Sequence, residues 1–261
     1  MTDAIEIHRI VVALDSMAEA RATLEGAARL AANLKADLKA LFVEDINVLR
    51  LSDLPVAEVQ ARGGAARRPD QATLRRELRA AAGEARRQVA RVATGRRLNW
   101  SFEVAQGPLF DTAIAAAGRL DLVALGRRAR RPPARRSRAE NLAWSPRPVV
   151  AVYDGSDEGR VAVTIATGQA DLPVTVVVPG AGPAERQSLV AAARRDLGAR
   201  AGRVGFRPCG AATGDLLAAL RESDGRLFLL PERRLGAAPG LLQGVLDAVG
   251  GDTFLVCGGG G

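Results

Sequence analysis

Short apolar runs alternate with amphipathic segments along most of the chain. The first run, residues 8–15, is rich in β-branched residues and ends on Asp15, which is typical of a buried strand. Apolar residues at helical spacing follow it, and a second apolar run covers residues 38–43. A strand, a helix and a strand in this order predict a right-handed parallel crossover unit. The residues expected on the buried face of this helix are Leu24, Ala27, Ala28, Ala31 and Leu34.

The rest of the first half predicts two more helices and two more strands. Residues 44–69 break into short apolar pieces, so we expect an excursion and a loop there. A long helix with an arginine-rich outer face follows, and strands are expected over residues 100–105 and up to Gly126. The expected buried positions are Leu74, Leu78, Ala81, Ala85, Val89 and Val92 in the long helix, and Phe110, Ile114, Ala117 and Leu120 in the next one.

The order of elements repeats in the second half. Residues 148–154 resemble the opening strand and again end on an acid, Asp154. A repeat of this size indicates two homologous α/β domains, which we place at residues 1–146 and 147–261. The first carries an insertion and the long helix over residues 44–97. It has four strands of its own, because the one strand between the halves is assigned to the second, unless residues 44–54 or a partner fill the position of its fifth strand. Further helices are expected over 157–169, 183–198, 216–220 and 241–249, and strands over 173–178, 203–208, 226–230 and 253–257.

The stretch from Asp121 to Glu140 predicts a strand, a glycine turn, a polar loop and a helix start. Ser137 stands three residues before Glu140, which is the spacing of a capping box. In open parallel sheets such a junction lies at the carboxyl edge of the strands, where backbone amides and a helix N-terminus can meet an anionic ligand. Seven arginines occupy the twelve positions from Arg127 to Arg138.

Composition narrows the function classes only slightly. The net charge of +8 would favour a polyanionic partner, but Lys35 and Lys39 are the only lysines among 37 basic residues. Alanine and glycine are also frequent, so we attribute the charge to codon bias. Cys209 and Cys257 are too few for a disulfide framework or a zinc site, and His8 at a strand entrance suits a surface or capping role. No apolar run approaches the ~20 residues of a membrane span, so we expect a cytoplasmic protein.

Four segments taken together resemble the universal stress protein family in its tandem form. They are residues 11–15, 40–45, 121–126 and 137–140, and their order and spacing cover almost the whole chain. The resemblance implies two Rossmann-like α/β domains of the adenine nucleotide alpha hydrolase-like type. Each would have a parallel sheet in the order 3-2-1-4-5, and the domains would pair through their last strands.

The resemblance also implies where a nucleotide would bind in the first half. The phosphate loop departs from the family pattern, because Ala129 takes the place of its second glycine. Its end aligns with either 139–140 or 136–137, and we prefer 136–137 because this keeps a hydroxyl at the helix cap. Without these glycines the backbone cannot approach the phosphates closely, whereas the arginines can supply positive charge to bind them. The implied residues are Ala13 or Leu14, Asp15 and Val43 for adenosine, and Gly126, Arg127, Arg128 and Ser137 for the phosphates.

The second half departs from the family pattern in another way. Asp154 is followed by a glycine and a serine, as in the family, but Pro231 and Glu232 replace the glycine loop. Proline has no amide donor and a glutamate repels phosphate, so we expect nucleotide binding to be disfavoured in this half.

These features predict a non-catalytic stress-response or regulatory protein that acts through protein contacts. They leave open whether it senses ATP or AMP, with magnesium, in its first domain. An ATP-hydrolysing enzyme and a polyanion binder through the Arg127–Arg138 loop stay as alternatives, although no Walker A motif or Ser/His/Asp set is present. The expected partners are the chain itself, as an internal pseudo-dimer or a homodimer, and an unidentified protein. A membrane is not expected, and nucleic acid is disfavoured because the basic stretches lack aromatic residues.

Overall fold

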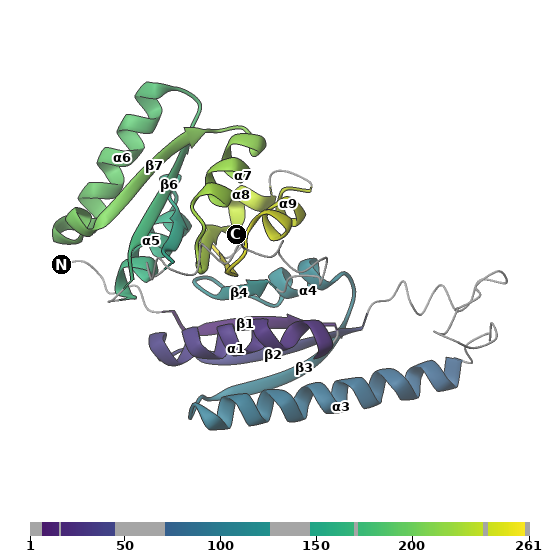
Figure 1. Cartoon of the computed structure of the whole chain (residues 1–261). Helices are drawn as coiled ribbons and strands as arrows, with labels where there is room; N and C mark the ends of the chain where they lie inside the picture. Colours follow the sequence, from purple (N-terminus) through teal and green to yellow (C-terminus); the bar gives the residue numbers. More distant parts are fainter. Residues whose placement is uncertain are drawn as a thin grey trace, which may run out of the picture. The chain divides into compact units, whose positions relative to one another are not determined.

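The computed structural model describes residues 7–15, 17–44, 71–125, 147–169, 172–236 and 240–258 (Figure 1). The chain divides into two compact units, one of Ile10–Ala116 and one of Met1–Arg9 with Ala117–Gly261. This division differs from the boundary expected between residues 146 and 147. The origin of the chain from two repeated domains therefore stays a prediction.

The unit Ile10–Ala116 contains three strands in the order β3-β2-β1, with helices packed against them. β2 and β3 pair in parallel, from Leu38 opposite Trp100 to Glu44 opposite Gln106. The predicted apolar face of α1 is fully buried except for Leu34, which is partly exposed. The elements are β1 (Arg9–Leu14), α1 (Met17–Leu34), β2 (Asp37–Glu44), α3 (Gln71–Gly95), β3 (Trp100–Gln106) and α4 (Leu109–Ala115).

The two later helices of this half depart from the predicted pattern. In α3, Ala85 and Val89 are fully buried, but Ala81, predicted to be buried, is exposed. Helical spacing marks a possible apolar face but does not fix how much of it finds a partner. The helix predicted to reach Leu120 ends at Ala115. Leu120, predicted to lie in this helix, has a left-handed φ of +62° and is therefore not helical. No helix among the described residues is both long and apolar enough to span a bilayer.

The second unit contains six strands in the order β4-β9-β8-β5-β6-β7. The strands β9-β8-β5-β6-β7 follow the order 5-4-1-2-3 and pair in parallel, which confirms the order predicted for the second half. The elements are β4 (Leu122–Leu125), β5 (Val149–Val152), α5 (Asp157–Gly168), β6 (Val174–Gly180), α6 (Pro183–Leu197), the 3₁₀-helix η2 (Gly198–Arg203), β7 (Val204–Gly210), α7 (Thr213–Glu222), β8 (Leu227–Pro231), α8 (Glu232–Gly236), α9 (Leu241–Ala248) and β9 (Asp252–Val256).

β9, the last strand of the chain, lies between β4 and β8. It pairs in parallel with β8 and antiparallel with β4, from Leu122 opposite Val256 to Leu125 opposite Thr253. Every residue of β4 is buried, so its backbone groups need strand partners. The described residues of the first half include no fifth strand, and the last strand of the second half pairs with β4.

Candidate functional site

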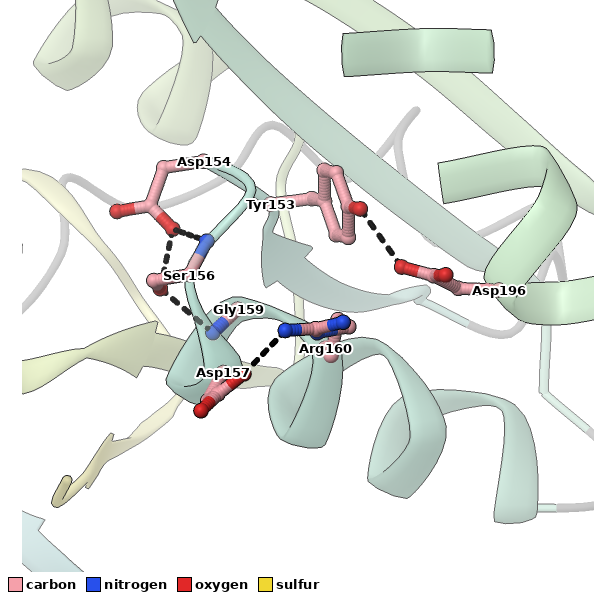
Figure 2. Close-up of polar contacts among 7 residues, drawn as sticks. All are labelled: Tyr153, Asp154, Ser156, Asp157, Gly159, Arg160 and Asp196. Carbon is pink, nitrogen blue, oxygen red and sulfur yellow. Dashed lines mark hydrogen bonds and ion pairs between the residues drawn. The ribbon is translucent and has the colours of Figure 1, made fainter. Parts of the chain in front are cut away.

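The turn from β5 into α5 is built by two glycines and a serine. Gly155 has a φ of +83°, a conformation that residues with a side chain rarely adopt. Ser156 is the N-cap of α5, and its Oγ accepts a hydrogen bond of 3.0 Å from the amide of Gly159. The turn therefore directs the chain from the end of β5 into the first turn of α5 (Figure 2).

Asp154 is held over this first turn of α5. Its Oδ1 accepts hydrogen bonds from the amide of Ser156 at 3.1 Å and from the hydroxyl of Ser156 at 2.5 Å. A Cβ on Gly159 would lie 2.8 Å from the same oxygen, so the position has no room for a side chain. Figure 2 shows the second carboxylate oxygen of Asp154 pointing away from Ser156. One oxygen orients the side chain, and the other is directed away from the turn.

A buried tyrosine anchors the end of β5. Tyr153 is 2% exposed, and its hydroxyl donates a 2.7 Å hydrogen bond to Oδ2 of Asp196 in α6 (Figure 2). Burial raises the pKa of the Tyr153 phenol above its ordinary value, and the hydrogen bond and charge of Asp196 raise it further. The phenol is thus a neutral donor, which ties β5 to α6 next to Asp154.

A cavity of about 410 Å³ opens beside Asp154 at the carboxyl ends of β5 and β8. Its volume is within the usual range of small-molecule sites. Asp154 contributes a carboxylate, while Arg233 and Arg234 contribute two guanidinium groups from α8. The other described residues that line it are Ala211, Thr213, Leu216 and Leu241.

The residues after β8 take different directions. Arg234 donates a 3.1 Å hydrogen bond to the carbonyl of Ala211, and both arginines line the cavity. Glu232 is not among the described lining residues, and its charge acts instead on the thiol of Cys257. Burial, followed by the nearby charge of Glu232, raises the pKa of Cys257 to about 12. The cavity lining therefore lacks the glutamate that we expected to repel a phosphate there.

The predicted adenosine residues of the first half lie at the ends of two neighbouring strands. Ala13 and Leu14 are buried at the end of β1, and Asp15 follows them as an exposed residue. Val43 is 2% exposed near the end of β2, the strand next to β1. These residues are brought to one region of their unit. The predicted phosphate residues Gly126, Arg127, Arg128 and Ser137 lie outside the described residues.

The arginine-lined cavity of the second half was not predicted from the sequence. Its signal was present as Arg233 and Arg234 directly after a buried apolar strand. We had expected a disrupted loop there, whereas the structure contains the short helix α8. Within the described part of the chain, no three His, Cys, Asp or Glu side chains are grouped so that they could hold a metal ion.

The sequence matches no protein-family model and no curated protein. The chain is similar to the solved structure of a universal stress protein from Archaeoglobus fulgidus DSM 4304, at 11% identity and a TM-score of 0.57, with 98% of each chain covered. It is also similar to a universal stress protein in complex with cAMP, at 20% identity and a TM-score of 0.36, over 43% of this chain and 97% of that chain. A protein of the same family from Burkholderia pseudomallei matches at 15% identity and a TM-score of 0.26, over 79% of this chain and 97% of that chain.

The match to the Archaeoglobus protein spans both chains almost completely and carries the fold assignment. It agrees with the strand order of the second half and with the Rossmann-like α/β class predicted from the sequence. The chain therefore has the fold of the universal stress proteins, as the resemblance in its sequence predicted.

Proposed function

We propose that the protein is a non-catalytic regulatory protein of the universal stress protein type, and that it responds to an adenine nucleotide. The observation that carries the proposal is the cavity beside Asp154. The order of the strands reverses at β5, because β6 and β7 lie on one side of it and β8 and β9 on the other. Ligands of open α/β sheets bind outside the carboxyl ends of the strands at such a switch point. The cavity lies at the ends of β5 and β8, on one side of that reversal.

The charged groups of the cavity suit a nucleoside phosphate. Two guanidinium groups, on Arg233 and Arg234, can bind phosphate oxygens with charge-assisted hydrogen bonds. The second oxygen of Asp154 can accept a hydrogen bond from a hydroxyl or amino group of the ligand. Apolar contact is available from Leu216 and Leu241. This combination supports AMP, or ATP with magnesium on its phosphates, as the ligand.

The first half supplies a second proposed location for the same ligand. Asp15 follows β1 as Asp154 follows β5, and Val43 lies near the end of the neighbouring strand. Ala13 or Leu14 would contact adenosine through the backbone. Gly126, Arg127, Arg128 and Ser137 complete the proposal from the sequence. Nucleotide binding would require a different aspartate at each of the two locations.

Calorimetric titration with AMP, and with ATP and magnesium, distinguishes the two locations. We expect Asp154→Ala and the double variant Arg233→Ala with Arg234→Ala to weaken binding at least about tenfold, because each removes a charged hydrogen-bonding group that lines the cavity. The double variant Arg200→Ala with Arg203→Ala is the matched control, since it removes the same charge from exposed positions of η2.

The outcomes decide between the two locations, or contradict nucleotide binding, or favour an enzyme. Loss of binding in Asp15→Ala alone would move the ligand to the first half. No binding of either nucleotide at millimolar concentration would contradict the proposal. Release of ADP and phosphate from ATP in the same samples, at a rate that Asp154→Ala or Asp15→Ala abolishes, would favour the enzyme alternative.

A further inference from the structure

The side chains of the edge strand β7 are more exposed than those of the neighbouring strand β6. It is the last strand of its order, with β6 on one side and no further strand among the described residues on the other. Six of the seven residues of β6 are buried, whereas none of the seven residues of β7 is. A strand edge of this kind has N–H and C=O groups that another extended chain can pair with.

Pro208 identifies which backbone groups of β7 face the open edge. Proline has no N–H, and in sheets it occurs at edge strands with its nitrogen turned away from the neighbouring strand. Because alternate residues of a strand direct their backbone groups to the same side, Val204 and Phe206 share the direction of Pro208. The residues between these three, such as Gly205, then direct their backbone groups toward β6. In agreement, the carbonyl of Val174 in β6 lies 3.7 Å from the place of a Cβ on Gly205.

Two grooves border β7, one beside α6 that reaches the strand at Pro208 and one beside α7. The side chain of Phe206 meets Arg194 of α6, with 5.2 Å between the guanidinium carbon and the ring centroid. The next side chain, Arg207, forms a 2.7 Å ion pair with Glu222 of α7. Successive side chains of a strand point to opposite faces, so α6 and α7 cover opposite faces of β7 (Figure 1). The groove on the α6 side has a volume of about 650 Å³, and the groove on the α7 side about 540 Å³.

The two grooves have different charges. The groove beside α6 is lined by Arg186, Arg194 and Arg195 together with Gln187 and apolar residues, and none of its described lining residues is acidic. The groove beside α7 has mixed charge, since Arg186 and Arg207 face Asp215 and Glu222 there. An extended chain added to β7 would direct every second side chain into the basic groove. Acidic residues at alternate positions match this groove.

We propose that the edge of β7 binds an acidic, extended segment of a partner protein as an added strand. Main-chain hydrogen bonds would supply affinity, and the arginines of α6 would select acidic side chains. A second copy of this chain is the less suitable occupant, because pairing two β7 edges would bring the arginines of both copies together. The inference concerns the protein contacts of the proposed regulatory role, and it does not depend on nucleotide binding at Asp154.

Fluorescence anisotropy with labelled peptides tests this proposal on the full chain. The probe is an octapeptide of alternating glutamate and valine, and its controls are the lysine–valine peptide and the same glutamate–valine peptide with N-methylated backbone amides. We expect the acidic probe to bind, the lysine peptide not to bind, and N-methylation to weaken binding at least about tenfold because it removes the ladder donors.

Charge reversal on the protein separates a specific groove from general attraction. Arg194→Glu with Arg195→Glu should weaken binding of the acidic probe at least about tenfold. Arg79→Glu with Arg86→Glu in α3 changes the net charge equally at exposed positions and should leave binding within about twofold. Circular dichroism spectra that match the unmodified protein would show that both variants are folded.

Three results would overturn the proposal. The first is equal binding of the N-methylated and unmodified probes, which would mean attraction by charge alone. The second is an equal loss in the α3 control. The third is a concentration-dependent dimer, seen by sedimentation, that does not bind the probe. If the double variant Arg194→Glu with Arg195→Glu also changes the fraction of dimer, β7 pairs with a second copy of the chain.

Discussion

The turn after β1 and the turn after β5 begin alike and continue differently. Both strands end in a short apolar run followed by an aspartate, Asp15 or Asp154. Asp154 is partly buried and holds two hydrogen bonds from Ser156, whereas Asp15 is exposed. The sequences that follow also differ, since Gly, Ser and Gly at 155, 156 and 159 correspond to Ser, Met and Ala in the first half.

This comparison shows that an acid at the end of a strand is not by itself an oriented site. The carboxylate of Asp154 is fixed because Gly155 permits a left-handed turn, Ser156 supplies a cap, and Gly159 leaves room above the helix. In the sequence of the first half, Ala20 stands at the position of the second glycine. A preorganised carboxylate loses less freedom on binding, which favours the second half as the ligand site.

The largest expected effect in this turn comes from Gly155→Val. A β-branched residue is strained at a φ of +83°, and a Cβ there would lie 3.0 Å from Cδ2 of Leu189. We expect the free energy of unfolding to fall by about 2–3 kcal/mol. Urea denaturation measures it, with Gly202→Val as the control at a position where a Cβ meets nothing within 4 Å. An equal loss in both variants would remove the special role of Gly155.

Gly159→Ala comes next, with an expected loss of about 1–2 kcal/mol. A Cβ would lie 2.8 Å from Oδ1 and 3.2 Å from the amide nitrogen of Asp154, so the carboxylate must move. The reciprocal variant Ala20→Gly should also lose stability, by up to about 1 kcal/mol, through its lower helix propensity. Propensity alone predicts that Gly159→Ala gains stability, so a gain measured by urea denaturation would show that the packing around Asp154 does not restrict this site.

Ser156→Ala tests the cap of α5. Loss of the N-cap hydroxyl should lower the free energy of unfolding by about 1 kcal/mol. It should also weaken nucleotide binding in the calorimetric titration, because Asp154 loses the hydroxyl that orients it. Ser156→Thr keeps the hydroxyl and should retain most of both properties. A threonine variant as defective as the alanine variant would mean that the hydroxyl is not the cause.

Tyr153→Phe should have the smallest effect at neutral pH, about 0.5 kcal/mol, because Asp196 is exposed and can be solvated by water. The pH dependence is more informative. The phenol keeps its proton to higher pH in the folded protein than in the unfolded chain, whose tyrosine titrates near 10.0. The stabilisation is therefore complete below that pH and is lost as the pH rises above it. Between about pH 9 and pH 11, the variant should lose less stability than the unmodified protein.

Much of the fold could be predicted because hydrophobic periodicity follows local geometry. The run ending at Asp154 and the helical spacing of Leu24 to Ala31 identified elements that the structure contains. Three features depended on distant residues and could not be predicted. Ala81 of α3 is exposed, β9 at the end of the chain pairs with β4, and the charge of Glu232 acts on Cys257.

The candidate site lies in the second half, where the sequence disfavoured a nucleotide. The acid after each opening strand was identified from the sequence, but Arg233 and Arg234 were not, because their direction depends on whether the residues after β8 form a loop or a helix. Charge in the sequence does not show which side chain faces a cavity. The residues proposed for the first-half phosphate loop stay a prediction.

The most direct test of the central claim is a crystal structure of the protein grown with AMP. The account predicts that the ligand binds at the carboxyl ends of β5 and β8, with its phosphate within hydrogen-bond distance of Arg233 or Arg234 and a hydroxyl or amino group on Asp154. A nucleotide bound instead beside Asp15 and Val43, with the cavity at Asp154 filled by water, would contradict it.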